Sequence, residues 1–375
     1  MKNVLVAAIL IWLATIVLVV FVSGFFPAKY FFPYRDVLLS YVAPNWSGFG
    51  NFDGVHYLMI AKEGYKGYQQ AFFPLYPLLI KLTAFLFGGN YFISGLVLSW
   101  LSYFLGVIIW FKVFQKLGLS QAKAKRTVAL WLVFPTSYYF LSIYTESLFF
   151  LLLGLCLYLL LTGRFWQLFV SEVLLSLARV VGVFFPIIVF FNSKLDWKKK
   201  IFLSLGSVLG VGLYSFYLVK ETGDPFYFVT AQKFFNNRQV DSWVFLPQVY
   251  YRYLKIFTTA DFSFAYFVAV LECLFFSLAF FVLVFYGIKK RFYYFYKDFS
   301  VEKGLFYYSF FVLLLPTLTG SFYSVPRFVL LIPSFMIYLA DLLSKNSFVF
   351  KLAVVLFLIL YALLTIAFAN GYFVA

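Results

Sequence analysis

The residues best suited to chemistry gather in one short polar stretch, NFDGVHYLMIAKEGY at 51–65. It holds an acid, Asp53, and the only histidine of the chain, His56, in a sequence that is otherwise largely apolar. A carboxylate can accept a proton from a hydroxyl group and so act as a general base. The stretch therefore indicates a site at which a hydroxyl group is activated.

Other segments carry polar side chains that could act with this acid. They are SIYTES at 142–147, ARVVG at 178–182, ETGDPFYFVTAQKFFNNR at 221–238 and YSVPRF at 323–328. Guanidinium groups bind phosphate through paired hydrogen bonds, so acids and arginines together suit a reaction on an anionic lipid. The candidate residues in these segments are Tyr144, Glu146, Arg179, Asp224, Gln232, Arg238 and Arg327.

The composition indicates that membrane helices must position these residues. Of 375 residues, 64% are hydrophobic and only 12% are charged, whereas about 25% of residues in soluble proteins are charged. The formal charge of +16 comes from lysines and arginines clustered between apolar runs, as in cytoplasmic loops, and does not indicate nucleic-acid binding. Cys156 and Cys273 both lie in apolar runs, which excludes a disulfide framework.

Apolar runs of about 17 to 25 residues can cross a bilayer, and basic clusters set their direction. We expect an all-α polytopic membrane protein, with about eleven membrane-inserted segments, an uncleaved first span and a single domain over residues 1–375. This threading places residues 23–90 and 220–262 in outer loops. The segments are 4–22, 91–114, 127–141, 147–162, 165–192 (entering and returning), 201–219, 263–287, 304–320, 327–343 and 348–369.

Two segments depart from a simple span. Residues 72–87 contain two prolines and a lysine and reach only about 24 Å as a helix, so we expect an interfacial helix on the outer side. Residues 165–192 carry Arg179 together with a glycine and a proline. Helices break at membrane depth only where they line protein or a wet cavity, and an arginine there is a candidate functional residue.

Each of the main candidates also has a structural interpretation. Asp53 could cap an interfacial helix, and Glu146 could favour a helix dipole. His56 could be a polar residue at a wet interface, and Arg327 could extend from a span towards the membrane surface. Asp224 precedes a proline and follows a glycine, as in a turn.

Six motifs occur in one order along the chain. The first two are FDGVHYLMIAKEGY at 52–65 and AFFPLYP at 71–77. The others are FPTSYYFLSIYTESLFF at 134–150, ARVVG at 178–182, GDPFYFVTAQ at 223–232 and PRFVLLIP at 326–333. This order resembles the GPI mannosyltransferase 2 (PIG-V-like) family, including its bacterial relatives, within the GT-C glycosyltransferases. One departure is Phe52, where the family pattern has tryptophan.

The resemblance implies a GT-C-like enzyme that transfers a sugar, usually mannose, from a polyprenyl-phosphate donor to a hydroxyl acceptor with inversion. The first-loop acid of the family falls on Asp53, the expected general base, and Glu146 is the second catalytic candidate. Arginines would stabilise the departing lipid phosphate. We expect the substrate-binding residues to be His56, Tyr57, Tyr144, Arg179, Asp224, Gln232, Arg238 and Arg327.

The resemblance also implies partners and a location. The partners are a polyprenyl-phosphate-linked sugar donor, a glycan or glycolipid acceptor and membrane lipid. No cofactor is required, although a divalent metal could lie between Asp53 and Glu146. The compact loops and short tail indicate a bacterial cytoplasmic membrane protein whose active site faces outward. A transporter or flippase of lipid-linked sugars is the alternative, because a broken helix with an arginine also suits transport.

Overall fold

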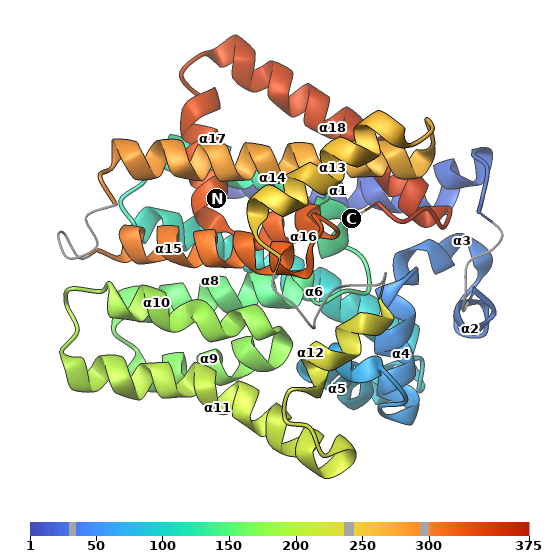
Figure 1. The fold of residues 1–375 in the computed structure, drawn as a ribbon, viewed down its shortest axis with the longest axis horizontal. Coiled ribbons are helices and arrows are strands. Elements are labelled where there is room, and N and C mark those ends of the chain that lie inside the picture. The colour runs from blue at the N-terminus through green and yellow to red at the C-terminus, as the bar shows by residue number, and fades with distance from the viewer. Residues whose placement is uncertain (30–34, 236–243, 293–299, 375) are drawn as a thin grey trace.

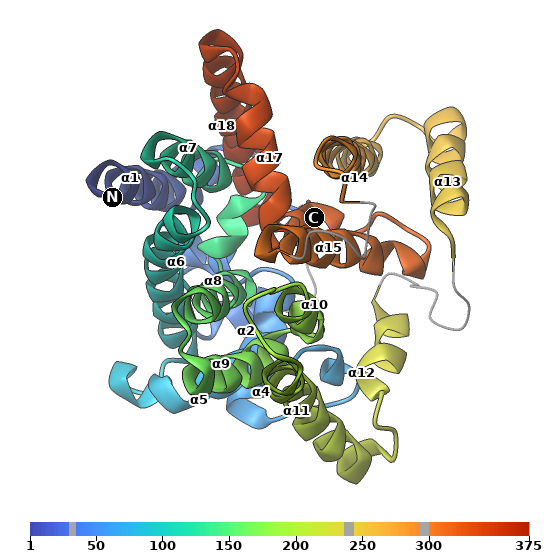
Figure 2. The ribbon, with the colours of Figure 1, turned by 90° about the vertical axis from the view of Figure 1, so that its left-hand side faces the viewer.

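The computed structural model describes residues 1–29, 35–235, 244–292 and 300–374. Every regular element in this part of the chain is helical (Figure 1). Together with the apolar composition and the long apolar helices, this makes the chain an all-α, multi-pass integral membrane protein, as predicted. Most of the long helices run in roughly one direction, so they appear nearly end-on in Figure 2.

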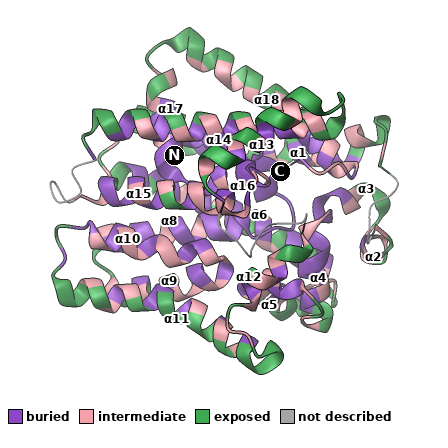
Figure 3. Cartoon of the chain, viewed as in Figure 1, coloured by how far each residue is buried: buried purple, intermediate pink, exposed green. Residues whose placement is uncertain are grey.

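Six helices in the described part are long and apolar enough to cross a bilayer. Large apolar side chains are exposed along their outer faces (Figure 3), among them Leu10, Phe216 and Phe281. Such faces fit contact with lipid, because all backbone polar groups are satisfied within a helix. The six are α1 (Lys2–Val17, continued to Phe25), α6 (Tyr91–Lys116), α11 (Trp197–Thr222), α14 (Phe264–Lys289), α15 (Val301–Leu314, continued to Thr319) and α18 (Ser347–Ala369).

The predicted span at 127–141 is wrong, because its residues do not form one helix. α7 (Gln121–Leu132) begins earlier, where the Ser120 side chain caps its first turn. It ends before Pro135, since a proline disfavours the helical conformation in the residue that precedes it. A short 3-10 helix, Ser137–Phe140, then leads towards the site.

The predicted span at 327–343 is also not one straight helix. α16 (Val325–Phe328) and a short 3-10 turn lead into α17 (Pro333–Leu343), and the two parts differ in direction by 86°. Proline favours the first turn of a helix and has no N–H group to continue the preceding one. The bend leaves Arg327 on a separate short helix.

The break at Arg179 confirms the prediction for 165–192. α9 (Phe165–Ala178) ends there, Arg179 is extended, and the chain returns through a 3-10 turn into α10 (Phe185–Phe190). Gly182 permits the return, because a Cβ atom at this position would lie 2.7 Å from the backbone of Leu175. The chain therefore reverses after α9, and α10 packs against α11 and α15, which run alongside it in Figure 1.

The outer loops of the sequence-based threading contain short helices that surround the site (Figure 1). α8 (Glu146–Thr162) packs between α6 and α9, with its first residue buried beneath these loops. The interfacial segment expected at 72–87 is a short helix, α5, extended by a 3-10 turn, whereas α13 was not predicted. The loop helices are α2 (Arg35–Leu39), α3 (Pro44–Ser47), α4 (Asp53–Glu63), α5 (Leu75–Thr83), α12 (Tyr227–Thr230) and α13 (Leu246–Thr259).

Candidate active site

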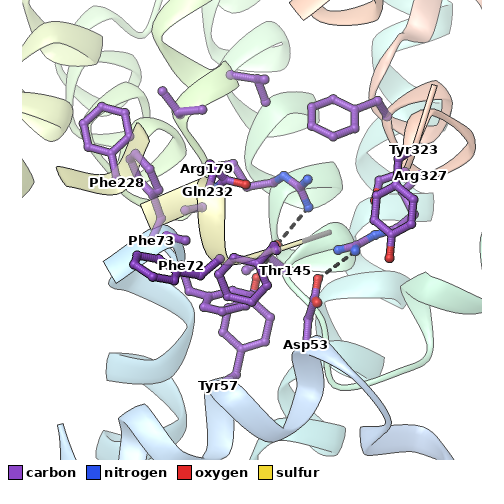
Figure 4. Close-up of a pocket in the computed structure, with 18 of the residues that line it drawn as sticks. Asp53, Tyr57, Phe72, Phe73, Thr145, Arg179, Phe228, Gln232, Tyr323 and Arg327 are labelled. Atoms are coloured by element: carbon purple, nitrogen blue, oxygen red, sulfur yellow. Dashed lines mark hydrogen bonds and ion pairs between the residues drawn. The ribbon is translucent and has the colours of Figure 1, made fainter. Parts of the chain in front are cut away.

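A cavity of about 280 Å³ lies where the start of α4, the break after α9, the α12 region and α16 converge. Figure 4 shows Asp53, Arg327 and Tyr323 on one side and the rings of Phe72, Phe73 and Phe228 on the other, with the guanidinium of Arg179 between them. A polar end beside an aromatic wall suits a ligand with a charged group and an apolar part. The lining residues that matter below are Asp53, Tyr57, Phe72, Phe73, Thr145, Arg179, Phe228, Gln232, Tyr323 and Arg327.

Asp53 is the first residue of α4, and the capping position before it is taken by Phe52. Asp53 is therefore not the helix cap that its sequence position allowed. Phe52 has φ 59° and ψ −116°, a conformation that costs a non-glycine residue roughly 1 to 3 kcal/mol. The Tyr144 hydroxyl fixes this turn by donating to the carbonyl of Asn51 at 2.8 Å and accepting from the Asp53 N–H at 3.2 Å. This strained turn places the Asp53 side chain at the cavity.

Arg327 joins two carboxylates that are far apart in the sequence. Its Nη1 atom lies 2.7 Å from Oδ2 of Asp53. Its Nε and Nη2 atoms lie 2.8 Å and 2.7 Å from Oε1 of Glu146. Short, charged hydrogen bonds of this kind are among the stronger polar contacts in proteins. The planar guanidinium thus fixes the distance between the two acids.

Arg179 completes the cluster from the broken helix. Its Nη1 atom donates to Oε1 of Glu146 at 2.8 Å and to Oγ1 of Thr145 at 3.0 Å. Glu146 is fully buried, whereas 7% of the Arg327 side chain, 14% of Arg179 and 22% of Asp53 is exposed. Buried charges need partners to offset their loss of hydration. Two acids and two arginines satisfy this need with no formal net charge.

Aromatic rings cover the two guanidinium groups. Cζ of Arg327 lies 4.7 Å from the ring centre of Tyr144 and 4.9 Å from that of Tyr139. Cζ of Arg179 lies 5.2 Å from the ring centre of Phe328. These cation–π contacts favour the charged arginines while keeping water away from them. The predicted residue Tyr144 therefore supports the site from behind rather than lining the cavity.

The remaining first-loop candidates lie at different depths. Tyr57 lines the cavity, and its hydroxyl is 3.4 Å from Oγ1 of Thr145. His56 lies behind the wall, with its ring stacked on Phe72 at 5.1 Å and edge-on to Phe235. Burial lowers the pKa of His56, although the charge of Asp53 opposes the shift, and the lowered pKa favours the neutral imidazole.

The second-loop candidates separate into three cases. Gln232 lines the cavity. Asp224 does not, because its carboxylate accepts hydrogen bonds from the N–H of Phe226 at 2.8 Å and from the hydroxyl of Thr230 at 3.1 Å. This is the turn that its sequence context also allowed. Arg238 lies outside the described residues.

Sequence reasoning missed several lining residues. Thr145 directly precedes Glu146 in the sequence, and its hydroxyl is a possible hydrogen-bond acceptor for a nearby arginine, which is the contact that it makes with Arg179. Ser324 adopts a left-handed conformation, φ 64°, before α16, which no local motif indicated. Phe72 and Phe73 form part of the aromatic wall of the cavity, which the interfacial helix expected at 72–87 does not indicate.

The suggested metal position between the two acids is held by Arg327. Its guanidinium bonds to both Asp53 and Glu146, so a divalent ion there would have to displace it. No group of three or more metal-ligating side chains occurs within the described residues. Arg327 thus supplies the positive charge that lies between the two acids.

The fold and the site define a multi-pass membrane protein that places an acid and two arginines at an aromatic cavity. A family model described as Mannosyltransferase (PIG-V) matches residues 5–194, and the chain belongs to this family. No curated protein and no solved structure matches the chain. The family makes the protein a membrane mannosyltransferase, which favours the enzyme over the transporter. The matched region includes Asp53, Glu146 and Arg179, and it ends before Arg327.

Proposed function

We propose that this mannosyltransferase transfers mannose from a polyprenyl-phosphate mannose to a hydroxyl group of a glycan or glycolipid. The observation that supports this most directly is the 2.7 Å contact between Asp53 and Arg327 at the cavity. It places a proton acceptor beside a phosphate-binding group. A reaction that deprotonates a hydroxyl while a phosphate departs needs both groups positioned next to the reacting atoms of the bound substrates.

The transfer is a single displacement with Asp53 as the general base. The acceptor oxygen forms a bond to the anomeric carbon, and its proton passes to a carboxylate oxygen of Asp53. The bond from the anomeric carbon to the phosphate oxygen breaks, and its electron pair leaves with the lipid phosphate. Attack from the face opposite the phosphate inverts the anomeric configuration. One carboxylate suffices because the phosphate departs without protonation, unlike the leaving group of a glycosidase.

Arg179 and Arg327 would stabilise the negative charge that builds on the lipid phosphate. Both line the cavity, and Glu146 holds both in fixed orientations. Preorganised charges in a site of low dielectric stabilise developing charge without reorganising during the reaction. Glu146 is buried away from the cavity, so we assign it a positioning role instead of a direct catalytic one.

The rest of the cavity would bind the sugar and the start of the lipid. The amide of Gln232 and the hydroxyl of Tyr57 can bond to sugar hydroxyls, while the rings of Phe228 and Phe328 can cover apolar surface. We propose that no metal is required, since Arg327 already provides a cation between the acids. From the charge distribution of the loops, we also propose that the site faces outward from a bacterial cytoplasmic membrane.

The experiment is a transfer assay with Asp53→Asn in the full chain reconstituted into nanodiscs. Asparagine keeps the size of the side chain but cannot accept the proton. We expect the rate of transfer from polyprenyl-phosphate mannose to fall by roughly two to four orders of magnitude, the usual share of general-base catalysis. Glu63→Gln is the matched control, because it removes an acid of the same helix that pairs with Lys66 at the surface. A wild-type rate for Asp53→Asn would refute the assignment.

A further inference from the structure

Arg327 is shared by two groups that need it at different stages of the transfer. In the structure its Nη1 atom bonds to Asp53, yet the same guanidinium lines the cavity where the donor phosphate would lie. We infer that the donor phosphate must displace Asp53 from Arg327, so that donor binding releases the base. The inference rests on the proposed function and adds an order to it, with the donor bound before the acceptor is activated.

The two carboxylates bound to Arg327 differ in how readily they can exchange. Glu146 is fully buried and holds the guanidinium through two nitrogens, Nε and Nη2, while also binding Arg179. Asp53 holds it through one nitrogen, and 22% of its side chain is exposed. Solvent and incoming ions therefore reach the ion pair at Asp53 more readily than the fully buried contacts of Glu146. Glu146 is the permanent partner, and Asp53 is the one that an incoming phosphate can replace.

During transfer, negative charge is lost from Asp53 and gained by the lipid phosphate, so the group that needs a positive counter-ion changes. The bound donor is a phosphate diester with one negative charge, and the lipid product is a monoester that gains a second. Asp53 loses its charge at the same time, because it takes the acceptor proton. One guanidinium can thus neutralise the base before the donor binds and the lipid phosphate from donor binding until the product leaves. When Asp53 later gives its proton to water, it can pair with Arg327 again and weaken the hold on the lipid product.

This competition predicts that removing the base strengthens donor binding. In Asp53→Asn the phosphate no longer competes with a charged carboxylate for Arg327. We expect the Kd for a short-chain polyprenyl-phosphate mannose, measured without acceptor in nanodiscs, to fall by roughly tenfold, which allows for the partial exposure of the pair. Glu63→Gln removes the same charge at the far end of α4 and should leave the Kd within about twofold.

A second variant tests donor binding without the amide oxygen of asparagine, which could still accept a hydrogen bond from Arg327. Asp53→Ala removes the acceptor of the Arg327 hydrogen bond altogether and must shift the Kd in the same direction. Unchanged or weaker donor binding by these variants, with transfer lost, would overturn the shared-arginine inference and leave the base assignment intact. Wild-type transfer by Asp53→Asn would instead refute the base itself, and the inference with it.

Discussion

Removing the charge of Glu146 tests whether this residue organises the site. Oε1 of Glu146 accepts hydrogen bonds from Nε and Nη2 of Arg327 and from Nη1 of Arg179, at 2.7 to 2.8 Å. In Glu146→Gln an acceptor oxygen remains, but two nearly buried guanidinium groups lose their common counter-ion. Breaking a buried ion pair from one side costs about 3 to 5 kcal/mol. Since Asp53 still neutralises one arginine, we expect a loss of about 3 kcal/mol in the free energy of unfolding.

Glu172 provides a matched control for this substitution. It is also fully buried, on α9, and the Ser207 hydroxyl donates to its Oε2 at 3.1 Å. The structure shows no ion pair for it among the described residues. Glu172→Gln should therefore change the free energy of unfolding by less than about 1 kcal/mol, since no arginine loses a counter-ion.

The assay is denaturant unfolding of both variants in mixed micelles, followed by transfer activity of the folded fraction. Glu146→Gln should also lower the transfer rate, because both arginines lose the shared charged partner that orients them at the cavity. The reasoning would be refuted if the two variants unfolded alike and Glu146→Gln transferred mannose at the wild-type rate. If Glu146→Gln and Glu172→Gln were equally destabilised and Glu146→Gln kept its activity, the Glu146 carboxylate would contribute only to packing.

Two further predictions concern the guanidinium of Arg327 and the membrane topology. Arg327→Lys should lower the transfer rate by at least about tenfold while the chain still folds, because an ammonium group cannot bind both carboxylates as the planar guanidinium does. The control is Arg252→Lys, since Arg252 donates to the Gly320 carbonyl, and equal activity of the two variants would argue against this role of the guanidinium. Reporter fusions should place residues 40–70, 225–255 and the C-terminus outside, and 115–125, 195–200 and 290–300 inside; a cytoplasmic tag near Gly89 would contradict the interfacial assignment of α5.

Local sequence determined which segments are helical and apolar. Hydropathy over about 20 residues reflects transfer into lipid, which depends on the segment itself. The long helices α1, α6, α11, α14 and α18 accordingly fall close to their predicted bounds. The break at Arg179 was also predictable, since glycine and proline act on their own backbone.

Local sequence did not determine where segments end when packing decides. α7 takes in basic residues that hydropathy assigned to a loop and then stops at Leu132. The chain at 327–343 bends by 86° instead of running straight. In both cases the apolar pattern continues past the end of the helix, so composition alone cannot show that the backbone turns.

The site residues were identified by type, but only the tertiary structure decided which of them meet. Asp53, Glu146 and Arg327 come from α4, α8 and α16. Asp53 and Arg327 are 274 positions apart in the sequence, yet the three residues form one cluster. His56 belongs to the same motif as Asp53, and Asp224 to the same motif as the cavity residue Gln232, yet His56 lies behind the wall and Asp224 closes its own turn. A sequence motif records which side chains are present, whereas an ion pair requires atoms within about 4 Å. That distance is set by how distant helices pack, and here the packing gives Asp53 and Glu146 a single shared arginine.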